Sequence, residues 1–465
     1  MNDTTISTRL SDFAADFALE QVPADVRRRA TYLMLDAIGI ALASTQFDFA
    51  HKTLAALKEL GGNDGTSPVI GTGQRLPLRD AVSMNALLVH GLDYDDTHPR
   101  GVIHATASVL PLALGVAAKH GLSGARVLSA YLLGVEAATR IGAAARGGFH
   151  QVGFHPTGLV GAFGCTLAAG HLLGLSAARL AHAQGIALSL ASGSLEFLQD
   201  GAWTKRFHPG WAGVAGLTAA TLARHDFIGP QAPYEGRFGL YASHLGPLLS
   251  ECDLALITAG LGEVWETTNI AIKPVPACHF THACADSAAA LHEQWAGAPI
   301  KRIRALVAEG VMKTVCEPIE TKRQPANAYD AQFSIPYSVA TGLLKGRFTL
   351  DALDPTAYTD PQTLAIAAKV QCEADPDADF PRVYSGEVIV ELEDGRVLRH
   401  REAVNRGAAD RPISEDDIVV KFHENAARAV SRAHADAVAR AVLGVEQGDA
   451  AELARLLSVP ARGQT

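Results

Sequence analysis

Charged residues are scarce in this chain. They make up 19% of its 465 residues, and the acidic excess gives a formal net charge of -9. A nucleic-acid-binding protein needs a basic face, so we expect no nucleic-acid partner. The first five residues lack the basic region and apolar run of a signal peptide. No apolar run of about 18 residues is free of charges and helix breakers, so we expect no membrane span.

Cysteine is also rare, and the motifs of the common cofactor sites are missing. The six cysteines form no Cys-x-x-Cys pair, which argues against a zinc ribbon or an iron–sulfur cluster. In a chain of this length they are typical of reduced thiols, so we expect a cytoplasmic protein. The sequence contains no Walker A motif, no dinucleotide-binding glycine fingerprint and no Gly-x-Ser-x-Gly elbow. These absences argue against the nucleotide-binding proteins and serine hydrolases that use those motifs.

The chain is instead rich in small apolar residues, which predicts a mainly α-helical protein. Residues 107–224 are almost wholly Ala, Leu, Gly and Val at helical spacing, as in closely packed buried helices. Alternating segments at 300–307, 368–372 and 386–392, with a turn at Asp394-Gly395 leading into 396–399, predict a small sheet. A capping-box-like start at Ser414 predicts a last long helix over about 415–443. We therefore expect an all-helical domain at 1–268, a smaller α+β lid domain at 269–405, and C-terminal helices at 406–465 that return to the first domain.

One polar stretch lies between two apolar helical segments. It reads Asp-Tyr-Asp-Asp-Thr-His at 93–98 and is followed by His104. A polar group between buried helices is costly unless it is paired or used. An Asp–His pair there can transfer protons, because a neighbouring carboxylate brings a histidine into its working range. The alternative is a loop in which Asp96 or Thr97 only caps a helix. The same side chains could in principle bind a divalent metal, but no firm ligand spacing supports this, and we expect no metal.

Three further stretches place cations or imidazoles beside the start of a predicted helix or beside prolines. His155 precedes a helical segment, where free N–H groups favour an anion, although a histidine bonded only to the backbone is the common alternative. Lys205 and Arg206 stand before a predicted helix, where cations oppose the helix dipole unless an anion joins them; the alternative is a solvated basic turn. Lys273 and His279 flank prolines near the expected domain boundary, and the alternative there is a rigid linker with incidental charge.

These stretches, in this order, resemble the MmgE/PrpD family, which includes 2-methylcitrate dehydratases, cis-aconitate decarboxylases and iminodisuccinate epimerases. The similar motifs are Asp-Tyr-Asp-Asp-Thr-His with His104, Phe-His-Pro at 154–156, Thr-Lys-Arg at 204–206, and Lys-Pro-x-Pro-x-x-His at 273–279. The resemblance implies a large helical domain with an α+β lid domain, a homodimer and no cofactor. It also implies a tyrosine of the lid domain in the decarboxylases, for which Tyr329 is the nearest candidate. By the same resemblance the active-site positions fall on Asp93, Thr97, His104, His155, Lys205, Lys273 and His279.

The predicted function is a cofactor-independent lyase that abstracts a proton next to a carboxylate of a small di- or tricarboxylate. Cations such as Lys205 and Lys273 would neutralise carboxylates and stabilise the developing negative charge. His104, oriented by Asp93, is the expected proton-transferring group, and Thr97, His155 and His279 are expected to bind substrate. A 2-methylcitrate dehydratase-like reaction is preferred, as the commonest assignment that the resemblance implies. Epimerisation, decarboxylation, or binding of polycarboxylates without catalysis are the alternatives.

Overall fold

The computed structural model describes residues 4–62, 64–380 and 382–460 and divides into two compact units. The first unit comprises 1–91, 95–270 and 414–465. The second comprises 92–94 and 271–413. The sequence predicts the boundaries at 268 and 405, whereas the chain passes between the units at 270–271 and 413–414. From the sequence, residues 92–94 were expected in the first domain, but they belong to the second unit. Asp93 therefore belongs to the second unit as well.

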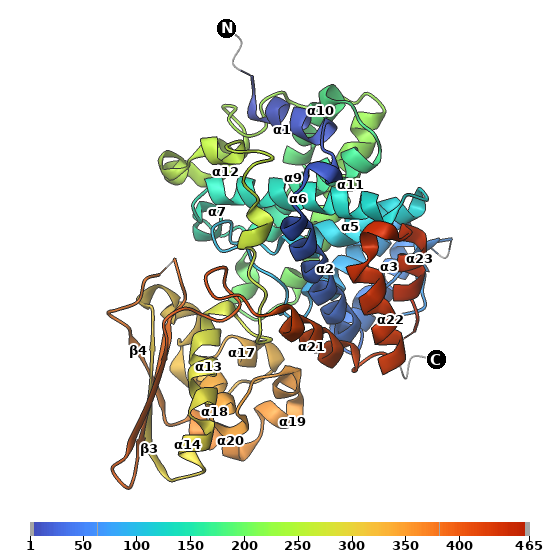
Figure 1. Cartoon of the computed structure of the whole chain (residues 1–465). Helices are drawn as coiled ribbons and strands as arrows, with labels where there is room; N and C mark the ends of the chain where they lie inside the picture. Colours follow the sequence, from blue (N-terminus) through green and yellow to red (C-terminus); the bar gives the residue numbers. More distant parts are fainter. Residues whose placement is uncertain (1–3, 63, 381, 461–465) are drawn as a thin grey trace. The chain divides into compact units, whose positions relative to one another are not determined.

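Helices form the first unit, as the small apolar residues predict (Figure 1). Its centre is made by α4, α5, α6, α9 and α11, which contact one another. Glycine permits the close approach of these helices: a Cβ on Gly164 would collide with the backbone of Gly134 on α6, and one on Gly216 would collide with Cys165 on α9. The helices are α1 (Ile6–Ala15), α2 (Ala24–Ser44), α3 (Asp48–Gly61), α4 (Leu78–His90), α5 (Ala105–Lys119), α6 (Gly124–Ala144), α7 (Gly148–Gln151), α8 (Pro156–Leu159), α9 (Gly161–Leu172), α10 (Ala177–Leu188), α11 (Thr204–Arg224), α12 (Leu240–Leu245), α21 (Glu415–Ala426), α22 (Arg432–Leu443) and α23 (Ala450–Leu457).

The C-terminal helices pack within this first unit. Both α21 and α22 contact α2, and Lys421 of α21 forms a buried ion pair with Asp36 of α2 at 2.6 Å. The capping box at Ser414 is present. The single long helix expected over 415–443 is wrong, however, because the chain leaves the helix after Ala426 and starts again at Arg432. Ser431 caps this second helix by accepting a hydrogen bond from the backbone N–H of His434.

Within residues 4–62, 64–380 and 382–460, one helix, α6, is long and apolar enough to cross a membrane, and the bent pair α2–α3 passes the same test of length and composition if taken as one span. All of the apolar window of α6 is buried within the protein. A helix that is apolar all round and covered on every side is typical of a protein core. We therefore assign α6 to the core of the first unit.

The second unit is a small sheet covered by helices on one face (Figure 1). The strands lie in the order β4-β3-β5-β6, with β3 parallel to β4 and antiparallel to β5, and with β5 antiparallel to β6. Helices α13 and α18 pack together against the strands. The elements are α13 (His282–Ala290), α14 (His292–Trp295), β3 (Ile300–Val307), α15 (Met312–Val315), α16 (Ile319–Arg323), α17 (Ala328–Gln332), α18 (Ile335–Lys345), α19 (Pro355–Tyr358), α20 (Pro361–Ala367), β4 (Val370–Ala374), β5 (Gly386–Leu392) and β6 (Val397–Glu402). In the described part of the first unit, the strands are limited to a short ribbon of β1 (Ser67–Pro68) and β2 (Arg75–Leu76), so the mainly α fold class is confirmed.

Candidate active site

The Asp-rich stretch is the loop between α4 and α5. Helix α4 ends at His90, and His104 is the last residue before α5. The backbone N–H of His104 donates to Thr157 Oγ1 at 3.1 Å, which fixes the start of α5 against α8. The side chains at both ends of the loop are thereby held by helices. This is the arrangement that positions chemical groups with little freedom.

His90 and His104 face the same carboxylate. His90 Nδ1 lies 2.8 Å from Asp95 Oδ2, and His104 Nδ1 lies 3.6 Å from the same oxygen. His104 Nδ1 also lies 2.8 Å from the carbonyl oxygen of Asp96 and 3.4 Å from Thr97 Oγ1. A carbonyl oxygen only accepts hydrogen bonds, so Nδ1 of His104 carries the hydrogen. In the neutral ring, Nε2 then holds the lone pair that can take up a proton.

His155 and His208 complete a group that we call the histidine cluster: His90, His104, His155 and His208. The ring of His155 lies 5.6 Å from that of His90 and 6.1 Å from that of His104. His155 Nδ1 and His208 Nδ1 are 3.0 Å apart, so one of them donates to the other. Burial, followed by the positive charges of neighbouring groups including His90 and Lys205, holds the pKa of His155 well below its usual range. His155 is therefore a neutral imidazole at physiological pH.

Lys205 and Arg206 lie in the first turn of α11, with 8% and 9% of their surfaces exposed. This burial excludes a solvated basic turn. Arg206 Nε donates to the carbonyl of Gly91 at 2.7 Å, and its guanidinium lies over the ring of Phe49. The charge of Lys205 contributes to lowering the pKa of His155 and of His208, the latter to about 4, where burial is the main cause. A cation buried at a positive helix end beside imidazoles suits an anionic ligand.

The two adjacent carboxyl groups of the loop differ in their surroundings. Asp96 is 2% exposed, and burial, followed by the negative charge of Asp95, raises its pKa to about 8. Asp96 is therefore mostly protonated at neutral pH. Asp95, by contrast, accepts the hydrogen bond of His90. Of the two, Asp95 is the one that can orient imidazoles as an anion.

A separate group of predicted residues lies in the second unit. Lys273, which is 2% exposed, donates from Nζ to the backbone oxygen of Asp93 at 2.8 Å and to Asp93 Oδ1 at 3.2 Å. Asn405 Nδ2 donates to His279 Nε2 at 2.6 Å. Burial and the charge of Lys273 lower the pKa of His279 to about 3. Tyr329 stacks on Phe333 at a ring distance of 4.6 Å, and its hydroxyl is shielded from solvent.

The structure thus groups the predicted residues differently from the expected pairing. His104, His155, Lys205 and Thr97 belong to the first unit, whereas Asp93, Lys273 and His279 belong to the second. The carboxylate beside His104 is Asp95, and Asp93 pairs with Lys273. Asp93 has a left-handed backbone with a φ of 50°, a conformation that Asp tolerates better than most residues. His90 and His208 are not among the site residues predicted from the sequence; for His90, the signal was an imidazole that ends an otherwise apolar helical run.

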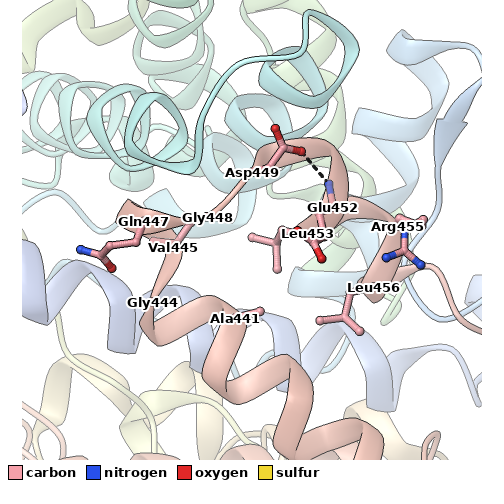
Figure 2. A pocket seen from close by; sticks show the side chains of 10 residues that line it. All are labelled: Ala441, Gly444, Val445, Gln447, Gly448, Asp449, Glu452, Leu453, Arg455 and Leu456. Atoms are coloured by element: carbon pink, nitrogen blue, oxygen red, sulfur yellow. Dashed lines mark hydrogen bonds between the residues drawn. The ribbon is translucent and has the colours of Figure 1, made fainter.

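Pockets elsewhere offer less chemistry. One of about 290 Å³ is lined by residues of α22, α23 and their connection, including Asp449, Glu452 and Arg455 (Figure 2). Asp449 accepts a hydrogen bond from the backbone N–H of Glu452 there, which caps α23. Its polar groups thus include a helix cap, and none of the predicted site residues lines it. The histidine cluster remains the candidate active site.

Comparisons with known proteins agree with the resemblance. Residues 8–250 match the MmgE/PrpD N-terminal domain, and residues 275–447 match the MmgE/PrpD C-terminal domain. The cis-aconitate decarboxylase-like protein oryM of Aspergillus oryzae is 26% identical over 97% of this chain and 97% of its own length. The cis-aconitate decarboxylase of Mus musculus is 27% identical over 93% of this chain and 89% of its own. That of Aspergillus terreus is 26% identical, with 98% and 96% covered.

Proposed function

The chain belongs to the MmgE/PrpD family, and we propose that it is a lyase that acts on a small tricarboxylate through proton transfer next to a carboxylate. The observation that carries this proposal is the fixed orientation of His104. Its Nδ1–H is held by the Asp96 carbonyl with Asp95 alongside, so Nε2 is the proton-transferring atom. An imidazole fixed in one tautomer by its outer hydrogen bond is the usual form of a general acid or base.

Cations next to this imidazole support a substrate with several carboxylates. In the first unit, Lys205 is buried and its charge acts on His155 and His208. A carboxylate bound there would form charge-assisted hydrogen bonds, and the fixed positive charge would stabilise the negative charge that develops on the carbon skeleton. Lys273 and His279 of the second unit are proposed to bind a carboxylate as well. The lid role of the second unit remains a prediction.

Decarboxylation is the first reaction to test. The three relatives described above carry names of cis-aconitate decarboxylases or of a decarboxylase-like protein and cover almost the whole chain. In a β,γ-unsaturated acid of this kind, the electrons of the breaking C–C bond form a new double bond as CO₂ leaves. The old π electrons take up a proton, which His104 Nε2 would deliver from its protonated form.

Dehydration, the reaction preferred from the sequence, is the second candidate. The observation that favours it concerns Tyr329, the nearest candidate for the tyrosine that the resemblance implies in the decarboxylases. Its hydroxyl is shielded from solvent and its ring is stacked on Phe333, which favours a packing role over a catalytic one. In dehydration, His104 Nε2 would remove the proton next to a carboxylate and the β-hydroxyl would leave as water. Epimerisation would use the same abstraction, followed by return of the proton. We further propose that the protein needs no cofactor, forms a homodimer and is cytoplasmic.

The reaction can be identified by NMR in heavy water with cis-aconitate, citrate and 2-methylcitrate as separate substrates. Decarboxylation gives a product one carbon shorter with deuterium at the protonated carbon, and dehydration gives a new vinyl signal without loss of carbon. The control is His104→Gln, which should form either product about 10²–10⁴-fold more slowly. Binding of these acids by the wild type, with neither turnover nor deuterium exchange, would instead support a non-catalytic polycarboxylate-binding protein and refute the lyase.

A further inference from the structure

Three buried imidazoles converge in the histidine cluster. One ring nitrogen from each of His90, His104 and His155 lies within 4.8 Å of those of the other two. The ring centres of His90 and His104 are 4.7 Å apart. General acid–base catalysis at His104 needs one imidazole with a proton-transferring nitrogen. The presence of three such rings with facing nitrogens is not explained by that role.

The outer hydrogen bonds of two of these rings orient them in the same way. His90 donates from Nδ1 to Asp95, and His104 donates from Nδ1 to the carbonyl of Asp96. In the neutral form of either ring, the lone pair is therefore at Nε2. Metal-binding histidines commonly have this outer support, in which a carboxylate or carbonyl accepts from one nitrogen while the other binds the ion.

The Nε2 atom of His90 gives an independent indication of a ligand. This atom is buried, and within residues 4–62, 64–380 and 382–460 no group hydrogen-bonds to it. A buried polar atom without a partner carries a desolvation cost, which a bound ligand would remove. His155 completes the set when it donates from Nδ1 to His208 at 3.0 Å, because its Nε2 then also offers a lone pair.

We propose that His90, His104 and His155 bind one divalent transition-metal ion of the Zn²⁺ class through their Nε2 atoms. Three imidazoles select Zn²⁺, Co²⁺ or Ni²⁺ over Mg²⁺ or Ca²⁺, which prefer oxygen ligands. Tetrahedral bonds of about 2.0 Å place the three nitrogens roughly 3.3 Å apart. One ring nitrogen of each histidine now lies within 4.8 Å of those of the other two, so ring rotations that close at most about 1.5 Å and turn the Nε2 atoms to the ion complete the site. The fourth position is open to water or to a substrate carboxylate.

The ion would act as an inhibitor. It would occupy the His104 lone pair on which proton transfer depends, so the metal-bound protein would be inactive until the ion is removed. This consequence for turnover rests on the proposed function. The metal site itself does not, because it follows from the three rings and their outer hydrogen bonds.

The test is a titration of chelator-treated full-length protein with Co²⁺, followed by the visible absorption of the bound ion in the absence of substrate. The wild type should bind one equivalent and show the intense bands of four- or five-coordinate Co²⁺, which Zn²⁺ should abolish by displacement. His90→Gln and His155→Gln should each lose these bands. Asp95→Asn should weaken binding by about 10–100-fold, as is usual when the outer partner of a metal-binding histidine is removed.

His171→Gln is the matched control. His171 is also buried in the first unit, but its Nε2 is bonded to Ser129 and its Nδ1 to the carbonyl of Ala14, so it offers no lone pair to the cluster. This variant should bind Co²⁺ as the wild type does. Circular dichroism checks that each variant is folded, and the two ligand variants provide independent tests if one of them is not.

Absence of Co²⁺ bands in the folded wild type, or bands unchanged in folded His90→Gln and His155→Gln, would overturn the metal site. Conversion of a tricarboxylate by a protein that binds no Co²⁺ would refute the metal site and support the proposed function. Binding of Co²⁺ at the cluster by a protein that converts no tricarboxylate would support the metal site and refute the proposed function. The two failures are therefore distinguishable.

Discussion

Replacement of His104 by glutamine separates the catalytic role of this residue from a structural one. The side chain is 11% exposed, and its Nδ1–H is bonded to the Asp96 carbonyl at 2.8 Å. A glutamine amide can donate to the same carbonyl, so the expected cost in folding free energy is at most about 1 kcal/mol, the usual value of one hydrogen bond. The amide cannot take up or release a proton near neutral pH. We therefore expect a folded variant that binds substrate but does not turn it over at a normal rate.

The expected loss in kcat is about 10²–10⁴-fold, the usual contribution of a general acid or base. This corresponds to a rise of about 3–5 kcal/mol in the activation barrier, well above the expected loss of stability. The assay is kcat and KM for the tricarboxylate that the wild type converts, together with the melting temperature of each protein. A folded His104→Gln variant with kcat near that of the wild type would refute the assignment.

Aspartate variants test which carboxylate orients His104. The sequence analysis expects Asp93, whereas Asp95 is the carboxylate that lies 3.6 Å from His104. Asp95→Asn should lower kcat, but by less than His104→Gln, because the Asp96 carbonyl still fixes the tautomer. Asp93→Asn should act mainly on KM by releasing its partner Lys273. Equal kcat in Asp95→Asn and the wild type, with a large loss in Asp93→Asn, would restore the original pairing.

Three further predictions concern cations, pH and metals. Lys205→Ala and Lys273→Ala should each raise the transition-state barrier by about 2–5 kcal/mol, measured as kcat/KM, since each removes the cation that binds a buried carboxylate of the substrate. Unchanged kinetics in a folded variant would show that this lysine does not belong to the site. The pKa of Asp96 is raised from 3.8 to about 8 in the folded protein. Between these two values the unfolded chain loses the Asp96 proton while the folded protein keeps it. The Asp96 carboxyl therefore lowers the free energy of unfolding increasingly as pH rises from about 4 to 8. Asp96→Asn should therefore gain stability over the wild type with rising pH, by up to about 4 kcal/mol at pH 7, in urea unfolding at several pH values; a difference that does not vary with pH would contradict this. Activity should survive exhaustive chelation, and loss of activity that Mg²⁺, Mn²⁺ or Fe²⁺ restores would show a catalytic metal instead.

The elements that the sequence predicted well are those with a strong repeat of their own. The strand predicted at 300–307 is β3 at Ile300–Val307, and that predicted at 386–392 is β5 at Gly386–Leu392. Alternation of buried and exposed side chains specifies a strand locally, so no distant contact is needed. The capping box at Ser414 was likewise predicted from local sequence. The break between α21 and α22 was not predicted, because the short stretch between them lacks glycine and proline.

The position of Lys205 shows where local reasoning failed. From the sequence, Lys205 and Arg206 are expected to stand before a helix, and they are followed by Pro209, a residue type common at the first position of a helix. The structure instead places it inside α11, which begins at Thr204. A proline at that point cannot donate to the carbonyl of Lys205 four residues earlier, so the first turn of α11 lacks a bond that helices usually make. Such an exception depends on packing of the whole helix and cannot be read from residue preference.

The pairing of side chains was harder still to predict, because spacing does not distinguish Asp93 from Asp95. The left-handed backbone at Asp93 lies within the short segment 92–94, whose contacts belong to the second unit, while Asp95 returns to the first. The sequence therefore identifies the stretch that carries the chemistry, and the tertiary contacts decide which carboxylate meets which base.

The loop's charge distribution bears on the kind of substrate that the histidine cluster can accept. Were Asp95 and Asp96 both ionised, their two charges would oppose the approach of an anion with several carboxylates. Burial and the charge of Asp95 keep the proton on Asp96 up to a pKa of about 8, and Asp95 is engaged by His90. The positive charge of Lys205 then favours an anion at the cluster. Deprotonation of Asp96 at higher pH would add a negative charge beside the cluster, so substrate affinity should fall as pH rises through 8, and Asp96→Asn should abolish that fall. A KM for the tricarboxylate that rises equally in both proteins between pH 7 and 9 would refute this role of Asp96.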